Sequence, residues 1–436
     1  MKVAILGGGV SGLSLAYFLQ REGVACEVLE AARVPGGLCR SDVVNGYVMD
    51  RAGGHILYSK SEAVRALWAD LFQDEPLVPN ERQTRILVQN RFVAYPFENG
   101  LGDLPPEINF ECTNGYIEAV FARRQGAPCP DNFRDWILYR MGEGIARHFM
   151  FPYNEKIWKV DLRELGVGWV EGRVPDAPLE DVLRSALSLR TVGYAHQAHF
   201  HYPRSGGFQA LTDRLAARVQ PLLRLETPVE DVQKTRQGVR VNGTPYDLVV
   251  STIPLNELAR IVHDLDSGTR QACTGMRFRG LASVLLGIPA EYVLPYSWIY
   301  LPFAHQGPAN RVTCLSNYSP GNAPPGRGSL LAEVTYEGDL DVTTPFLDDL
   351  EKSLVSCGLF PAGCVDLRHF AKNTYAYLVF DRRFEERRQR AIEGIEAYGI
   401  LPLGRFGRYD YNNSDHCILD AKSLSERIVA LKNTGA

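Results

Sequence analysis

The sequence has no marked excess of either charge. Its 47 lysines and arginines stand against 51 aspartates and glutamates, which gives a formal net charge of −4. This balance argues against nucleic acid or an anionic membrane surface as the main partner. The chain also lacks an apolar run of the roughly 18 residues needed to cross a bilayer. A strand pattern that begins at Lys2 leaves no room for a signal peptide.

The sequence also lacks paired cysteines. Its nine cysteines are scattered and contain no C-x-x-C pair, which favours reduced thiols in a cytoplasmic protein over a disulfide frame or zinc site. His196, His199 and His201 form an H-x-x-H-x-H pattern. No carboxylate or cysteine lies near them in sequence, so we interpret them as ordinary strand histidines and predict no metal. We also find no nucleophile elbow, no H-E-x-x-H and no internal repeat.

Length and composition predict an ordinary globular protein. The 436 residues are 45% hydrophobic and 22% charged, so disordered, collagenous, coiled-coil and disulfide-stapled classes are excluded. At about 150 residues per domain, two or three domains are expected.

The first thirty residues carry a dinucleotide-binding pattern. An apolar strand over residues 3–6 leads into GGGVSG at 7–12, a helical stretch, a second strand and then Glu30. Gly7 permits the tight turn, Gly9 admits a pyrophosphate, and Gly12 lets helix and strand pack closely. The helix N-terminus favours phosphate, and Glu30 is placed to accept bonds from ribose hydroxyls.

A second glycine pair selects the dinucleotide. Gly36-Gly37-Leu38 follows Glu30 within eight residues, which resembles the two-dinucleotide-binding flavoprotein pattern. A second glycine loop lets the backbone reach the far side of a long cofactor, so the pattern favours FAD over NAD. Ser11, Gly37 and Leu38 join Gly7, Gly9, Gly12 and Glu30 as predicted FAD-binding residues.

The coarse pattern along the chain predicts an α/β protein in which the nucleotide domain is discontinuous. Residues 1–60, 203–255 and 395–436 are assigned to a Rossmann-like FAD-binding domain. Residues 61–202 form a mostly helical insert with a flap, and 256–394 a mostly antiparallel sheet domain.

Short motifs along nearly the whole chain resemble those of the flavin-dependent UDP-galactopyranose mutases, especially their eukaryotic-type branch. The landmarks include Gly53-Gly54-His55, residues 95–97 (YPF), 152–158 (PYNEKIW), 311–320 (RVTCLSNYSP), and 404–407 (GRFG) with Tyr411 and Asp415-His416. The resemblance implies an isomerase that interconverts pyranose and furanose forms of a nucleoside-diphosphate hexose without net redox change. It also implies that reduced FAD is the active form, that its N5 acts as a covalent nucleophile, and that NAD(P)H or another reductant activates it. A role in galactofuranose and cell-wall glycan biosynthesis would accompany that activity.

Matching positions supply the roles that the resemblance implies. Arg173, on a flap, and Arg311 would clamp the diphosphate, because guanidinium forks neutralise it bidentately. The remaining predicted catalytic residues, near the sugar and flavin, are His55, Tyr318, Tyr377 and Tyr411. Further FAD contacts would come from Arg405, Asp415 and His416. The predicted substrate-binding residues are Glu98, Phe149, Tyr153, Asn154, Trp158, Gln197, Trp298 and Tyr300.

Two departures from the family pattern concern the substrate. Glu98 stands where the family usually has glutamine, and Gly193 and Gln197 stand where it usually has asparagines. An ionised carboxylate only accepts hydrogen bonds, which suits the adjacent N–H donors of guanine better than the carbonyls of uracil. The same chemistry on another nucleotide sugar, such as a GDP-linked one, is therefore an alternative. So is an amine-oxidase or protoporphyrinogen-oxidase type of oxidoreductase, which shares the N-terminal motifs, and so is a non-catalytic flavin or nucleotide-sugar binder. Sugar, nucleoside, reductant and oligomeric state do not follow from the sequence.

Overall fold

The computed structural model describes residues 1–170, 177–189, 198–236 and 238–434. Two predicted site residues, Arg173 and Gln197, lie outside this range, as does Gly193. Among the described residues, none of the helices is both long enough and apolar enough to span a bilayer.

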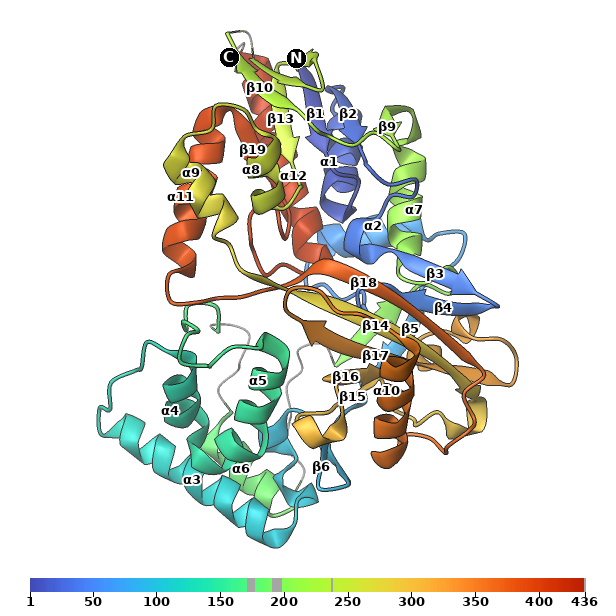
Figure 1. Ribbon diagram of the computed structural model, residues 1–436, viewed down its shortest axis with the longest axis vertical. Coiled ribbons are helices and arrows are strands. Elements are labelled where there is room, and N and C mark those ends of the chain that lie inside the picture. Colours follow the sequence, from blue (N-terminus) through green and yellow to red (C-terminus); the bar gives the residue numbers. More distant parts are fainter. Residues whose placement is uncertain (171–176, 190–197, 237, 435–436) are drawn as a thin grey trace.

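A five-stranded parallel sheet gathers three distant parts of the chain. Its strand order is β19-β13-β1-β2-β9, and every neighbouring pair runs parallel. The strands are β1 (Lys2–Leu6), β2 (Ala25–Leu29), β9 (Leu223–Arg224), β13 (Leu248–Ser251) and β19 (Ile400–Pro402). Val3 to Leu6 are fully buried, as expected of a strand covered on both faces. Helices α1 (Val10–Arg21), α7 (Gln209–Arg218) and α12 (Ser414–Thr434) pack beside this sheet in the upper part of the molecule (Figure 1).

A seven-stranded sheet crosses the middle of the molecule. Its order is β18-β14-β17-β16-β15-β6-β7, and only the β15–β6 pair is parallel among its described pairings. The strands are β6 (Thr84–Val88), β7 (Arg91–Ala94), β14 (Phe278–Pro289), β15 (Trp298–Tyr300), β16 (Arg311–Thr313), β17 (Arg327–Tyr336) and β18 (Leu367–Leu378). The predicted helical insert thus lends two strands, β6 and β7, to this sheet.

The helices of the insert form the lower part of the molecule (Figure 1). They are α3 (Pro106–Arg124), α4 (Phe133–Ile145), α5 (Phe151–Trp158) and α6 (Leu179–Ala186). Helices α3 and α4 pack closely because glycines meet at their contact: a Cβ on Gly142 would lie 2.1 Å from the Gly115 carbonyl oxygen. Gly142 has a φ of 76°, which interrupts α4.

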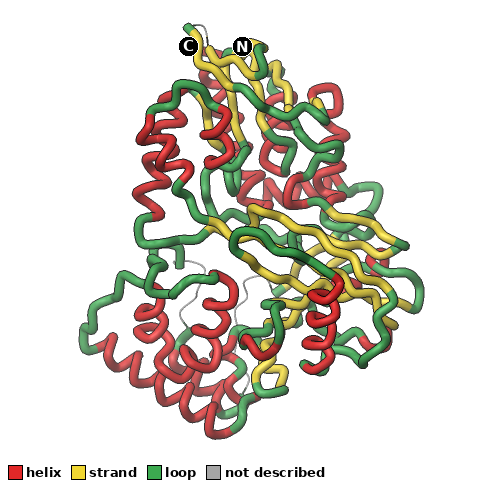
Figure 2. Tube along the Cα trace, in the orientation of Figure 1, coloured by secondary structure: helices red, strands yellow, loops and turns green. Residues whose placement is uncertain are grey.

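Smaller elements complete the fold, and Figure 2 distinguishes the helices, strands and loops along the trace. The remaining helices are α2 (Glu62–Leu71), α8 (Leu255–Ile261), α9 (Ser267–Thr274), α10 (Thr344–Ser356) and α11 (Phe384–Tyr398). The remaining strands are the ribbon β3 (Ser41–Val44) with β4 (Tyr47–Asp50), the ribbon β5 (Val78–Glu81) with β8 (His199–Tyr202), and the sheet of β10 (Val232–Thr235), β11 (Gly238–Val241) and β12 (Thr244–Tyr246). The predicted α/β fold, with a parallel nucleotide-type sheet and a second, mostly antiparallel sheet, is confirmed.

Candidate active site

Three glycine loops meet at the start of α1. Gly7 has a φ of 103°, and a Cβ there would lie 2.3 Å from Oγ1 of Thr252. Gly36 donates its N–H to the Gly8 carbonyl at 2.8 Å and forms a parallel bridge with Gly9. A Cβ on Gly404 would lie 2.5 Å from Oγ of Ser11, so the third loop closes on the first.

This junction fits a dinucleotide. A Cβ on Gly9 would find only Gly37 Cα within 4 Å, at 4.0 Å, so the backbone there is open to a ligand. Helix α1 has no side-chain cap and no acid in its first turn, which leaves its amides for an anion. Glu30 accepts bonds from the N–H groups of Gly8 at 2.7 Å and Ala32 at 2.8 Å, which orients its carboxylate beside the loop. The predicted residues Leu38 and Asp415 are partly buried and buried, and the exposed His416 lies 3.2 Å from Asp415.

His55 lies in the loop after β4, and the carbonyl of its neighbour Gly54 accepts a hydrogen bond from Arg311. Its ring stacks on Phe208 with centroids 4.8 Å apart, and its buried Nδ1 has no partner among the described residues. Burial, followed by the charges of Arg311 and Arg405, lowers the pKa of His55 to about 4. The imidazole is therefore neutral at physiological pH, with one nitrogen unused by the protein. A flavin ring edge would satisfy that nitrogen.

Arg311 and Glu333 form an ion pair close to His55. Arg311 donates from Nε and one terminal nitrogen to both oxygens of Glu333, at 2.7 and 2.8 Å, and Glu333 is fully buried. Burial opposes the charge on Arg311, but the Glu333 carboxylate more than offsets this and raises the pKa of the guanidinium. The two residues are direct cross-strand neighbours on β16 and β17, so the sheet register itself makes the pair.

The same carboxylate fixes the His55 loop. Gly54 donates its N–H to Glu333 at 3.2 Å, and its carbonyl accepts from Arg311 at 3.3 Å. A Cβ on Gly53 would lie 2.7 Å from a Glu333 oxygen, so only glycine fits there. Glu333 therefore positions both the predicted diphosphate clamp and the predicted flavin-side histidine.

Asp50 also stabilises the loop that carries His55, since it accepts a hydrogen bond from the His55 N–H. It is fully buried and accepts from Tyr202 Oη at 2.9 Å, Ser41 Oγ at 2.7 Å and the Phe208 N–H at 3.0 Å. Burial raises the pKa of Asp50 to about 6, against the opposing effect of these bonds. Neither Asp50 nor Glu333 was a predicted site residue. The signal for Glu333 is a lone acid inside the apolar run of residues 330–334.

Aromatic side chains line the path from Arg311 toward the helical insert. Tyr153 meets Tyr300 edge-on at 5.0 Å, and Phe149 stacks on both Tyr153, at 5.3 Å, and Phe97, at 5.1 Å. The pKa of Tyr153 is raised by burial and by neighbouring tyrosines, and is lowered in part by Arg311. The structure thus brings together Arg311 and three predicted tyrosines: Tyr153, Tyr300 and Tyr377.

Asn154 and Trp158 lock each other on α5. The Asn154 amide donates to the Met150 carbonyl at 2.7 Å and accepts from the Trp158 indole at 3.2 Å. Trp158 in turn meets Tyr377 edge-on at 6.2 Å. In this geometry Asn154 positions Trp158. Glu98 is buried, and its charge contributes to raising the pKa of Tyr95.

Arg82, which sequence reasoning did not predict, lies close to two aromatic rings. The Arg82 guanidinium lies 4.5 Å from the ring centre of Tyr95 and 4.8 Å from that of Trp298. Tyr318, by contrast, is buried among Phe200 and Tyr202, and its hydroxyl lacks a partner among the described residues. Arginine between two aromatic faces is held by both, and only the folded structure brings these three residues together.

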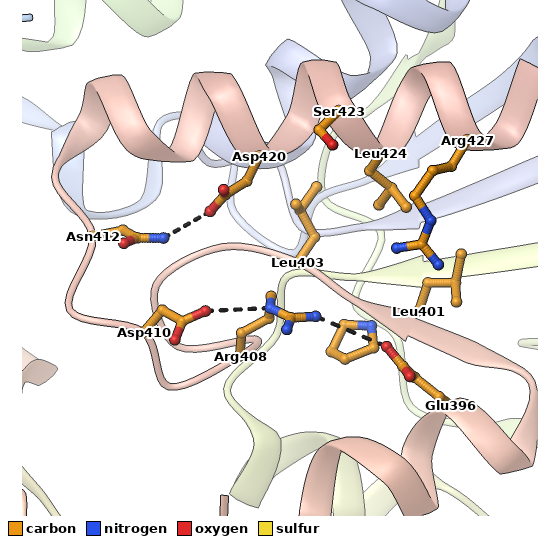
Figure 3. Close-up of a pocket in the computed structure, with 11 residues that line it drawn as sticks. Glu396, Leu401, Leu403, Arg408, Asp410, Asn412, Asp420, Ser423, Leu424 and Arg427 are labelled. Carbon is orange, nitrogen blue, oxygen red and sulfur yellow. Dashed lines mark hydrogen bonds and ion pairs between the residues drawn. The ribbon is translucent and has the colours of Figure 1, made fainter. Parts of the chain in front are cut away.

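The loop after β19 carries Arg405 and Tyr411. The Arg405 guanidinium lies 4.4 Å from the Tyr411 ring centre and donates to the Asn412 carbonyl at 2.9 Å. Asp410 and Asn412 instead line a cavity of about 430 Å³ between this loop and α12 (Figure 3). There Arg408 bonds Asp410 at 3.2 Å, and Asn412 donates to Asp420 at 2.7 Å.

These paired groups fix the loop from outside, so we assign the cavity a structural role. A charged guanidinium and predicted tyrosines converge instead at Arg311.

Comparison with known proteins gives the class. Residues 10–353 match the model of the family described as flavin containing amine oxidoreductase, so the chain belongs to that family. Membership implies a flavin cofactor.

The fold is similar to that of a UDP-galactopyranose mutase. A crystal structure of the reduced form of such an enzyme matches with a TM-score of 0.89, 24% identity, and coverage of 99% of this chain and 96% of that one. The dTDP-fucopyranose mutase of Escherichia coli is 20% identical over 177 residues, which is 38% of this chain and 43% of that protein. The coproporphyrinogen III oxidase of Staphylococcus aureus (strain NCTC 8325 / PS 47) is 25% identical over 178 residues, 38% of each chain. The sequence alignment with each of these two relatives thus covers well under half of that relative's length.

Proposed function

We propose that this protein is a reduced-FAD-dependent mutase that interconverts the pyranose and furanose forms of a nucleoside-diphosphate hexose. The observation that carries the proposal is the Arg311–Glu333 ion pair, which lies close to several tyrosines. The fully buried Glu333 carboxylate keeps the partly buried Arg311 guanidinium charged, and a diphosphate that leaves a sugar needs such a charge.

Bound reduced FAD would supply a nucleophilic nitrogen and would return unchanged after each turnover. The glycine junction of Gly9, Gly37 and Gly404 would hold its dinucleotide part. The Glu30 carboxylate retains lone pairs for ribose hydroxyls. Neutral His55 has a free ring nitrogen that can share a hydrogen bond with the flavin edge.

The remaining roles belong to the protein side chains. Arg311 neutralises charge on the departing diphosphate, and Glu333 holds its fork in place. Tyr153, Tyr300 and Tyr377 exclude water and present hydroxyls to a detached sugar, since a tyrosine joins a rigid apolar ring to one polar tip. Arg173, which lies outside the described residues, would complete the clamp if the family resemblance holds at this position.

A second candidate is an oxidoreductase of the amine-oxidase or porphyrinogen-oxidase type. The family match and the partial likeness to coproporphyrinogen III oxidase favour it. An oxidase consumes one oxygen or acceptor per turnover, whereas a mutase consumes almost no reductant.

The test uses the flavin-loaded protein under anaerobic conditions with dithionite. UDP-, GDP- and dTDP-hexoses are supplied singly, and pyranose and furanose isomers are separated by chromatography. Isomer formation only with reduced flavin supports the mutase. Oxygen uptake with amine or porphyrinogen substrates in a parallel aerobic assay without dithionite, and no isomer with any sugar, would instead establish the oxidase.

A further inference from the structure

Arg279 is the largest fully buried side chain among the described residues, and the proposed reaction gives it no part. It is the second residue of β14 and is 2% exposed. A buried guanidinium is costly unless its donors are bonded. Among the described residues the acid that pairs with it is Glu337, at 2.9 Å, which is itself 58% exposed. The main reason for burying this cation therefore lies in its other contacts.

Those contacts include backbone carbonyls at the end of α5, the helix of the insert nearest to the central sheet (Figure 1). Arg279 donates from Nε to the Trp158 carbonyl at 2.7 Å, and from a terminal nitrogen to the Lys159 carbonyl at 3.4 Å. The last carbonyls of a helix have no partner within the helix and carry a partial negative charge. A guanidinium supplies both the donors and the opposite charge, so Arg279 caps α5 from the sheet.

Arg279 also lies opposite Tyr377, a predicted catalytic residue. The two are direct partners in the pairing of β14 with β18, so their side chains lie on the same face of the sheet. Trp158, whose carbonyl Arg279 holds, meets Tyr377 edge-on at 6.2 Å. Arg279, Trp158 and Tyr377 therefore form a closed set of three contacts that joins the helical insert to the sheet.

Further bonds fasten the same turn of α5. The Lys156 carbonyl accepts from Oγ1 of Thr335, on β17, at 3.1 Å. The Lys156 ammonium donates to the carbonyls of Leu301 and Phe303, at 2.8 and 3.0 Å, directly after β15. The last turn of α5 is thus bonded to three neighbouring parts of one sheet, and Arg279 supplies the contact at its very end.

We propose that Arg279 is a positioning residue for the substrate site, because its cap on α5 holds the Trp158 ring against Tyr377. The proposal rests on the proposed function in taking these two residues as part of that site. A contact residue that must be ordered anew at each binding event costs affinity. Without the cap, the ring is expected to leave its place, while the glycine junction assigned to the flavin is unaffected.

The first measurement needs no substrate. The flavin-loaded protein is produced with 5-fluorotryptophan, and Trp158→Phe identifies the Trp158 signal among those of the five tryptophans in fluorine NMR. Arg279→Met keeps a long apolar side chain without the guanidinium, and is expected to shift or broaden that signal more than the others. Glu337→Gln retains the carbonyl bonds and is expected to leave it in place. Arg277→Met is the matched control, because Arg277 lies just before β14 and pairs with the exposed Glu164 at 3.0 Å.

The second measurement uses whichever substrate the wild type turns over in the isomerase and oxidase assays. Arg279→Met is expected to raise KM about 10-fold and to change kcat less than about twofold, because Trp158 is assigned to substrate binding and not to a reacting atom. Arg279→Lys keeps a donor for the Trp158 carbonyl and is expected to recover much of the loss. Failure of the proposed function shows as a wild type without isomerase activity, whereas failure of the positioning role shows as variants that match the wild type.

Flavin occupancy and far-ultraviolet circular dichroism report whether each variant folds. If Arg279→Met does not fold, Arg279→Lys and Thr335→Val supply the test, the latter by removing only the bond from β17. If the wild type turns over no substrate, the fluorine signal alone decides. A Trp158 signal that stays in place or a KM that stays at the wild-type value in folded Arg279→Met would overturn the proposal. So would a Glu337→Gln variant with effects as large as those of Arg279→Met, because the ion pair and not the helix cap would then be responsible.

Discussion

Glu333 offers the sharpest test of how the site is held together. Replacing it with leucine keeps most of its volume and removes its carboxylate. Arg311 then loses two charged hydrogen bonds, at 2.7 and 2.8 Å, and Gly54 loses its acceptor. Breaking a buried pair on one side typically costs about 3–5 kcal/mol, because the other charge stays buried without compensation. The Arg311 side chain keeps 21% exposure, so we expect the lower end of that range, about 3 kcal/mol.

The double variant Arg311→Leu with Glu333→Leu separates stability from function. It removes both charges, and well-packed apolar replacements for a buried pair are often neutral or stabilising. Its stability is therefore expected to return to within about 1 kcal/mol of the wild type. Its turnover is expected to stay lost, since the cation that would grip the diphosphate is gone.

The assay pairs urea unfolding of the flavin-saturated proteins with isomer formation under reducing conditions. A common excess of FAD keeps the contribution of ligand binding equal among the variants. The reasoning fails if Glu333→Leu costs under about 1 kcal/mol, or if the double variant is no more stable than that single one.

Three further predictions concern Asp50, Asn154 and Glu98. Burial raises the pKa of Asp50 to about 6 from 3.8, so the folded protein holds this proton more tightly than the unfolded chain. The resulting stability is present below about pH 4 and is lost as pH rises through about 6, and Asp50→Asn is expected to remove that slope from urea midpoints measured between these values. Asn154→Ala leaves the Trp158 indole N–H without its partner and is expected to lower the free energy of unfolding by about 1–3 kcal/mol, whereas Asn154→Gln tests whether any amide suffices. Glu98→Gln is expected to shift preference from GDP- toward UDP-linked sugars in competition assays, and unchanged preference would refute the assignment of Glu98 to base recognition.

Local features of the sequence are the basis for the predicted cofactor-binding residues. The glycines at 7, 9 and 12 and the acid at 30 act within one strand–turn–helix–strand unit, so their spacing alone defines their roles. The α/β class and the mixed arrangement of two sheets also follow from local patterns. The boundaries follow less well, because β6 and β7 join a sheet whose other strands lie about 200 residues later.

The residues that sequence reasoning missed act across strands or between distant loops. Glu333 becomes a site residue only because β16 and β17 pair in the register that sets it opposite Arg311. Arg82 gains its position from rings contributed by Tyr95 and Trp298, more than 200 residues apart in sequence. No local pattern encodes such contacts. The amide of Asn154 shows the converse: its residue type suggests base recognition, while its helical position lets it bond Trp158 four residues on.

The charge around His55 bears on the choice between the two candidate reactions. Burial first, and then the charges of Arg311 and Arg405, lower the pKa of this histidine to about 4, so two guanidinium groups place positive charge near it. A positive field favours an anionic substrate and disfavours a protonated amine. Nucleotide sugars and porphyrinogen carboxylates meet this requirement, and simple amines do not. Added salt is therefore expected to raise KM for the true substrate while leaving kcat almost unchanged. A KM that is indifferent to salt would remove the electrostatic argument for a diphosphate at Arg311.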